Sequence, residues 1–124
     1  MFASRIAVIA LAAALTLPAA AQDSAGLDDL DADRLNSRQV LVEFDYDGGA
    51  CEDVGEAQLG DLTDGTLAIT LSVMANAEVC TLQVVHHEIK EAIPAGPDVT
   101  HVEVTLLAPD GRVMGTGTVK VDED

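Results

Sequence analysis

Aromatic side chains are nearly absent from this chain, which has one tyrosine, two phenylalanines and no tryptophan in 124 residues. Only Phe44 and Tyr46 lie beyond the first 21 residues. Sites that stack sugars or nucleobases use aromatic faces, and protein interfaces concentrate binding energy in aromatic residues. The scarcity disfavours a lectin or a nucleotide-binding protein, and it predicts a core of Val, Leu, Ile and Ala.

Basic residues are also few. Six lysines and arginines stand against 22 aspartates and glutamates, which gives a formal net charge of −16 at pH 7. Nucleic acids and anionic lipid surfaces are bound through clusters of Lys and Arg. We therefore expect neither as a ligand. The acidity is compatible with a basic partner, with a cation, or simply with solubility through self-repulsion.

A long apolar run occurs only once, near the N-terminus. Residues 6–17 are apolar except for Thr16, they follow Arg5, and they lead through Pro18 to three alanines at residues 19–21. This pattern is typical of a secretory signal peptide, and the run is shorter than the roughly 20 residues that span a bilayer. The sequence predicts a signal peptide over residues 1–21, no stable membrane insertion after cleavage, and a periplasmic or secreted mature chain.

Residues 22–38 are polar and acidic, with five aspartates and with leucines spaced for one short helix. A helix of that length is marginal on its own, so we predict a flexible acidic arm. The length that remains suits one domain, which we place over residues 39–121 with an acidic tail over 122–124.

Alternating apolar and polar residues indicate β-strands beyond the arm. Residues 50–64 are acidic and rich in glycine, with room for a short edge strand. Strands do not alternate with helical patterns, which disfavours a parallel α/β sheet. We predict an all-β domain, a small antiparallel β-sandwich of immunoglobulin-like architecture, with an open barrel as the alternative. The clearest strand patterns cover residues 40–46, 67–73, 79–89, 99–107 and 113–121.

Connections between these strands can be predicted as well. Apolar residues on both faces of residues 79–85 indicate a central strand, with a hairpin connection at 75–77 before it. Pro109 and Gly111 predict a tight turn between the last two strands. Gly115 and Gly117 fall on the same face of their strand as its apolar residues. They therefore mark either a bulge or the close approach of a neighbouring backbone.

The two cysteines, Cys51 and Cys80, are too far apart for a local C-x-x-C redox motif. Glu52 and Asp53 disfavour a thiolate at Cys51, which argues against a reactive cysteine. Exported proteins fold where thiols oxidise. The sequence therefore predicts one structural disulfide that joins two parts of the domain.

Histidines and nearby acids are the candidate metal ligands. His86 and His87 should point to opposite faces of a strand, so only one of them can share a face with His101. Two imidazoles and a carboxylate suit zinc or copper, with Glu103 as the nearby acid.

Calcium would need clustered oxygens instead, which Asp45 and Asp47 could contribute near Gly48. An EF-hand beginning at Asp29 is excluded because Arg34 and Val40 occupy the positions that need glycine and glutamate.

Catalytic motifs are missing. Ser72 is the only serine in the predicted domain and lies within a strand pattern without a nucleophile-elbow sequence. No phosphate-binding glycine loop or cofactor fingerprint occurs. We therefore expect no enzyme and no cofactor, and we predict an exported protein-binding or structural accessory module that meets another exported protein through strand edges and acidic surface. The alternative is a metal-binding accessory protein that uses the histidines and acidic loops.

Overall fold

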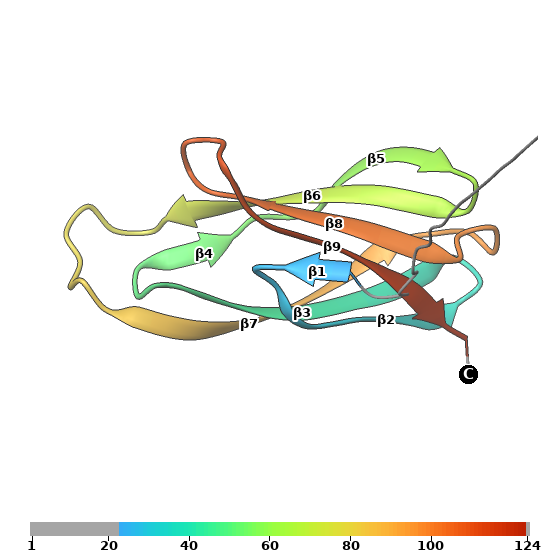
Figure 1. The fold of residues 1–124 in the computed structure, drawn as a ribbon, viewed down its shortest axis with the longest axis horizontal. Helices are drawn as coiled ribbons and strands as arrows, with labels where there is room; N and C mark the ends of the chain where they lie inside the picture. Colours follow the sequence, from blue (N-terminus) through green and yellow to red (C-terminus); the bar gives the residue numbers. More distant parts are fainter. Residues whose placement is uncertain (1–22, 124) are drawn as a thin grey trace, which may run out of the picture.

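The computed structural model describes residues 23–123, and 69% of these residues lie in β-strands (Figure 1). Among residues 23–123 there is no helix with the length and apolarity of a membrane span. The predicted signal peptide, residues 1–21, lies outside the described residues. The strands are β1 Asp23–Ala25, β2 Asp28–Asn36, β3 Gln39–Gly49, β4 Glu52–Val54, β5 Gln58–Thr63, β6 Thr66–Ala75, β7 Val84–Pro94, β8 His101–Leu107 and β9 Val113–Asp122.

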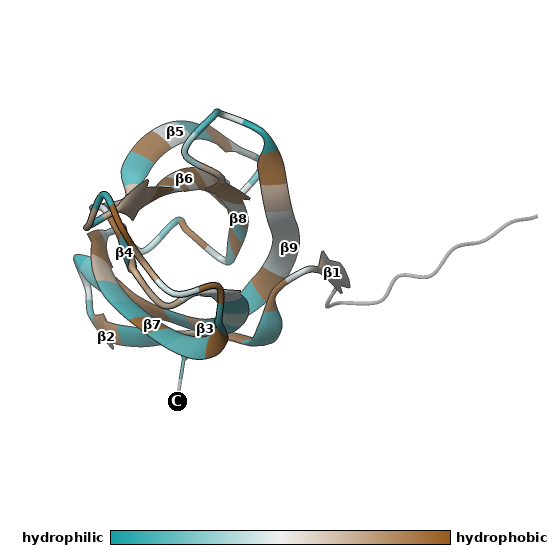
Figure 2. Ribbon diagram, turned by 90° about the vertical axis from the view of Figure 1, so that its left-hand side faces the viewer, coloured by the Kyte–Doolittle hydropathy of each residue, from teal (hydrophilic) through white to brown (hydrophobic). Residues whose placement is uncertain are grey.

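The strands form one sheet that curls round on itself and is nearly closed. Its order is β4-β6-β8-β9-β2-β3-β7, with β5 beside β6 and β1 beside β9. Figure 2 looks along this roll, with β5 and β6 on its upper side and β3 and β7 on its lower side. The predicted all-β class is confirmed. The sheet is mixed rather than purely antiparallel, because β6 pairs with β8 and β2 pairs with β9 in parallel.

The core is aliphatic apart from the two predicted aromatics. In β3 the alternate residues Val40, Val42, Phe44 and Tyr46 are at most 1% exposed. They face buried side chains of the other layer, and none of the buried residues between 25 and 123 is polar or charged. Burial of aliphatic area is the main favourable contribution to the folding free energy. The opposite layer contributes Leu67, Ile69, Leu71, Val73, Val102, Val104 and Leu106.

The prediction of a flexible arm with a short helix is wrong. Residues 28–36 form β2, which lies between β3 and β9. Leu30 and Ala32 are buried there, and Asp29 has a φ of 54° that a right-handed helix does not contain. The leucine spacing suggested a helix, but pairing on both sides of the segment decides its conformation. The ordered β-domain therefore starts before residue 39.

The prediction of a central strand through Cys80 is also wrong. β7 starts only at Val84 and stands at the end of the sheet order, where it pairs with β3. No hairpin forms at residues 75–77, because β6 and β7 belong to different layers. Apolar residues on both faces suggested a buried position, yet Val79 and Leu82 are exposed.

The hairpin of the last two strands is confirmed. Gly111 has a φ of 91° and its N–H donates to the carbonyl of Ala108 at 2.8 Å. Both predictions for Gly115 hold, since the pairing register shifts between Leu106 and Leu107, and a Cβ at Gly115 would lie 3.0 Å from the carbonyl oxygen of Ala25. The absent side chain lets β1 pack against β9.

Candidate functional site

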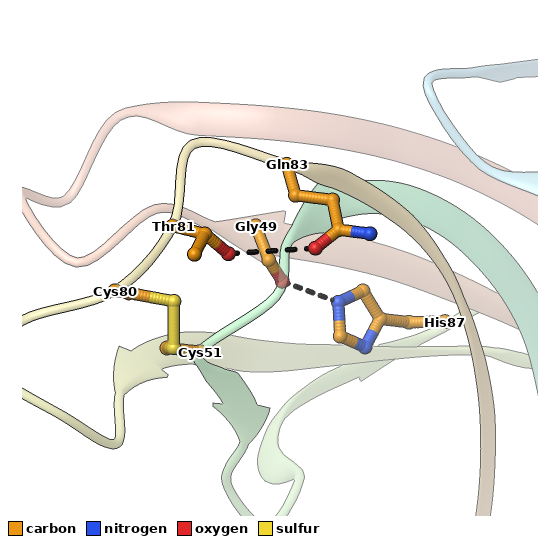
Figure 3. Close-up of a disulfide and its surroundings, with 6 residues drawn as sticks. All are labelled: Gly49, Cys51, Cys80, Thr81, Gln83 and His87. Atoms are coloured by element: carbon orange, nitrogen blue, oxygen red, sulfur yellow. Dashed lines mark hydrogen bonds between the residues drawn. A yellow bond between two sulfur atoms is a disulfide. The ribbon is translucent and has the colours of Figure 1, made fainter.

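A disulfide joins Cys51 to Cys80, as predicted, with the two Cα atoms 6.0 Å apart (Figure 3). It ties the turn between β3 and β4 to the connection between β6 and β7. The N–H of Asn76 also donates to the carbonyl of Cys51 at 3.0 Å. A disulfide indicates that the protein folds in an oxidising, exported compartment.

The segment held by this disulfide exposes aliphatic side chains. We call residues 76–84 the anchored loop. Val79, Leu82 and Val84 are 89%, 105% and 78% exposed, the highest values among the large apolar residues of the described chain. Burying one such side chain is worth roughly 1.5–3 kcal/mol. A loop that is fixed in place while its valines and leucine stay in water is a candidate binding surface.

Strand β7, whose first residue Val84 is also the last residue of the anchored loop, has a free edge. It pairs with β3 along all 11 of its residues, and the sheet order ends there. The N–H of Ala95 donates to the carbonyl of Arg38 at 2.8 Å, so odd-numbered residues turn their backbone groups toward β3. Even-numbered residues of β7 therefore turn theirs away from it. Pro94, which has no N–H, belongs to this outward set, as expected at a sheet edge.

The outer surface of β2, β3 and β7 is strongly acidic. Cross-strand register places Asp31 opposite Glu43 and Asp45 opposite Glu88. The basic side chains among these carboxylates are His86 and Lys90. We call this surface the acidic face, and it comprises Asp31, Asp33, Glu43, Asp45, Asp47 and Glu88.

His86 lies in the acidic face and pairs with carboxylates. Its Nε2 is 3.2 Å from a carboxylate oxygen of Asp45, and its Nδ1 is 3.0 Å from one of Asp47. Hydrogen bonds that its ring donates, first to Asp47 and then to Asp45, raise the pKa of His86 above its ordinary value. The two aspartates that sequence reasoning offered as calcium ligands thus hold a histidine.

His87 points to the opposite face of β7, as predicted. Its ring stacks on Tyr46 with the ring centres 4.9 Å apart. Its Nε2 lies 2.7 Å from the carbonyl oxygen of Gly49 (Figure 3). The hydroxyl of Tyr46 donates to Glu52 at 3.2 Å. Burial, followed by the charge of Glu52, raises the pKa of Tyr46 to about 12. This group of side chains fastens the ends of β3, β4 and β7 to one another.

His101 is not brought to either of the other histidines. It lies on β8, whose neighbours are β6 and β9, whereas β7 pairs with β3 in the other layer. Its Nδ1 lies 2.9 Å from the hydroxyl of Thr100, and Glu103 is exposed two residues further along β8. The predicted combination of His86 or His87 with His101 and Glu103 is therefore not assembled.

The described residues contain one group with metal-ligand spacing, which sequence reasoning missed. Oxygens of Asp31, Asp33 and Glu43 all lie within 4.8 Å of one another. Carboxylate oxygens suit calcium rather than zinc or copper. Lys90 lies 3.5 Å from Glu43 and would compete with a cation for that carboxylate. The sequence shows only that Asp31 and Asp33, two residues apart, would share one face of a strand. The pairing of β2 with β3 is what brings Glu43 to them.

Comparison with protein-family models, curated proteins and solved structures finds no match for this chain. The candidate functional surfaces of the described chain are therefore the anchored loop, the acidic face and the edge of β7.

Proposed function

We propose that this protein is an exported, non-enzymatic accessory module that binds an aliphatic and basic segment of another exported protein. The observation that carries the proposal is the anchored loop, where Val79, Leu82 and Val84 remain in water although a disulfide holds the segment in place. We also propose the periplasm or the extracellular space as its location, which the disulfide supports. One sheet that curls round an aliphatic core and nearly closes favours the open barrel over the immunoglobulin-like sandwich as its architecture.

The chemistry of the partner follows from the two neighbouring surfaces. Aliphatic side chains of the partner would cover the anchored loop, because removing apolar area from water is the favourable step. Lysines or arginines of the same partner would face the acidic face, whose carboxylates attract and orient a cationic segment. A net charge of −16 extends this attraction beyond the contact itself.

Site-specific photo-crosslinking tests this proposal. A photoreactive side chain at position 82, in the protein exported by living cells, is expected to capture one partner. The same group at position 113 is the control, because Val113 is also exposed, at 54%, but lies outside the anchored loop. The captured peptide should contain aliphatic residues flanked by Lys or Arg. Equal capture at both positions, or none at position 82, would contradict the proposal.

A pair of substitutions separates binding from folding. Val79→Ser with Leu82→Ser should abolish capture by a photoreactive group at position 81, an exposed position of the anchored loop outside β7. The midpoint of urea unfolding should stay unchanged because both substituted side chains are already in water. Val113→Ser is the matched control and should leave capture intact.

Calcium binding is the second candidate function, favoured by the gathering of Asp31, Asp33 and Glu43. Calorimetric titration of the purified chain with calcium should give a stoichiometric signal that Glu43→Gln removes. Asp61→Asn, an exposed acid on β5, is the control and should leave the signal unchanged. If wild-type protein gives no heat of binding, or if the two variants behave alike, this site is not a calcium site.

A further inference from the structure

We propose that β7 pairs antiparallel with β7 of a second copy of this chain, so that the sheet runs continuously through a two-fold symmetric dimer. The inference goes beyond the proposed function, because it uses the free edge of β7 and makes no use of Val79 or Leu82.

The backbone of β7 limits the registers that can form. The backbone N–H and C=O groups of Ala95 and of the odd-numbered residues before it point toward β3. Those of the even-numbered residues therefore point away from β3 and are available to a second strand. In an antiparallel pair the two residues that exchange hydrogen bonds stand directly opposite each other. An even-numbered residue must therefore meet an even-numbered residue of the second copy.

The side chains select one of the permitted registers. If the two-fold axis passes at Ile89, Glu88 stands opposite Lys90 of the second copy, and Lys90 stands opposite Glu88 of the second copy. The same register places His86 opposite Ala92 of the second copy, so it creates no like-charge pair among the even-numbered residues. Opposite charges directly across a strand pair are stabilising. The sequence of β7 is therefore complementary to itself when read in the reverse direction.

Neighbouring registers bring like charges together. Moving the axis to position 88 sets Glu88 against its own copy and Lys90 against His86 of the second copy. Moving it to position 90 sets Lys90 against its own copy. Like charges directly opposite each other destabilise a strand pair. A register centred on residue 87 sets Glu88 opposite His86 of the second copy, but it pairs only residues 84–90 of each strand. The register centred on Ile89 joins Glu88 to Lys90 and pairs all 11 residues of β7, so it is the favoured one.

The central pair is apolar and partly exposed in the single chain. Ile89 packs at the margin of the core, and its side chain keeps intermediate exposure. Odd-numbered pairs of this register do not exchange backbone hydrogen bonds, and such pairs bring their side chains closest together. The contact between the two Ile89 side chains would remove apolar area from water at the centre of the interface.

The net charge of the chain does not prevent this pairing. The two Glu88 and the two Lys90 side chains at the centre of the interface sum to zero. The acids on β3 lie three strand spacings from those on β3 of the second copy, about 14 Å. That distance exceeds the Debye length of about 8 Å at physiological ionic strength, so their repulsion is largely screened.

Sedimentation equilibrium of the mature chain and of two charge variants tests the proposal. The wild-type chain should show a concentration-dependent shift from one chain mass to two. Glu88→Lys alone and Lys90→Glu alone should each lose this shift, because each variant puts like charges opposite each other. An equimolar mixture of the two variants should regain the dimer, since every pair then joins a lysine to a glutamate.

The mixture also controls for folding and for net charge. Unfolded variants would not regain a dimer on mixing, and far-ultraviolet circular dichroism verifies their strand content. Glu88→Lys makes the chain less negative, so an effect of net charge alone would strengthen its self-association instead of abolishing it. A wild-type chain that stays monomeric at every concentration, or variants that remain dimeric alone, would overturn the proposal. Neither result would affect crosslinking at position 82, which tests the proposed function separately.

Discussion

Arg34 fixes the connection between β7 and β8 with a single side chain. Its guanidinium donates to the carbonyl oxygens of Asn36, Ala95, Gly96 and Val99 at 2.8–3.1 Å, and the side chain is only 11% exposed. An arginine offers five donors in a rigid planar group, which a lysine cannot replace. The sequence does not reveal this role, because three of the four backbone acceptors lie about 60 residues away along the chain.

We expect both Arg34→Lys and Arg34→Ala to lower the free energy of unfolding by about 2–3 kcal/mol, because carbonyl oxygens lose charged donors. Urea unfolding measures the difference. Arg38→Ala, a change at an exposed arginine four residues away, is the control and should stay within about 0.5 kcal/mol of wild type. A fully stable Arg34→Lys variant would show that the guanidinium geometry is unimportant.

Tyr46 offers a spectroscopic test of the packing where β3 and β4 meet. Its pKa is raised to about 12 by burial first and by Glu52 second, from an ordinary value of 10.0. The stabilising effect is complete below about pH 10 and is lost as pH rises toward 12, since the unfolded chain ionises first. The chain has one tyrosine and no tryptophan, so ultraviolet absorbance reports this phenol alone.

In an alkaline titration we expect the absorbance change of native protein near pH 12 and that of urea-unfolded protein near pH 10. Glu52→Gln should lower the native value without bringing it to 10, because burial remains. If the phenol of Tyr46 ionised near pH 10 in the native protein, as it does in an unfolded chain, the packing described here would be contradicted.

Among the elements, the anchored loop depends most on a covalent link. The disulfide closes a sequence separation of 29 residues. On the loop-entropy account such a link stabilises the native state by about 3–4 kcal/mol. Cys51→Ser with Cys80→Ser should lower the free energy of unfolding by about that amount and weaken capture at position 82.

The single variant Cys80→Ser should match the double variant in stability, which shows that the bond and not the free thiol matters. If denaturation midpoints in urea coincide for the wild-type chain and both variants, the link contributes nothing to stability.

The strands differ in how well the sequence predicts them. β3, β6, β8 and β9 each bury one face, and burial on one face produces the alternation that identifies a strand. β2 was missed because its two buried positions are set by contacts with β3 and β9, which no local pattern reveals. β7 was placed too early because Val79, Leu82 and Val84 resemble core residues until their exposure is known.

Among the candidate surfaces, too, a feature was predictable only where it shows in the local sequence. The disulfide was predictable from two cysteines in an exported chain. The gathering of Asp31, Asp33 and Glu43 was not, because it depends on which residues stand opposite each other in two strands.

At the scale of the whole molecule, charge is the dominant feature. A net charge of −16 on 124 residues produces repulsion between carboxylates, whereas few ion pairs among the described residues oppose it. Salt screens the long-range repulsion, so we expect sodium chloride to raise the melting temperature of the protein.

Calorimetry in low and in physiological salt measures this shift. Sucrose at matched osmolality is the control for effects other than screening. A melting temperature that falls as salt is added would mean that the ion pairs of Arg34, His86 and Lys90 outweigh the general repulsion.

The pairing of β2 with β9 has a consequence for how the chain acquires its structure. The second strand of the described chain needs the last one beside it, so the sheet cannot be completed until nearly the whole polypeptide has been made. Contacts between residues so distant in sequence also form slowly. A newly synthesised chain would therefore stay extended for a time, which is the state that a narrow translocation channel accepts.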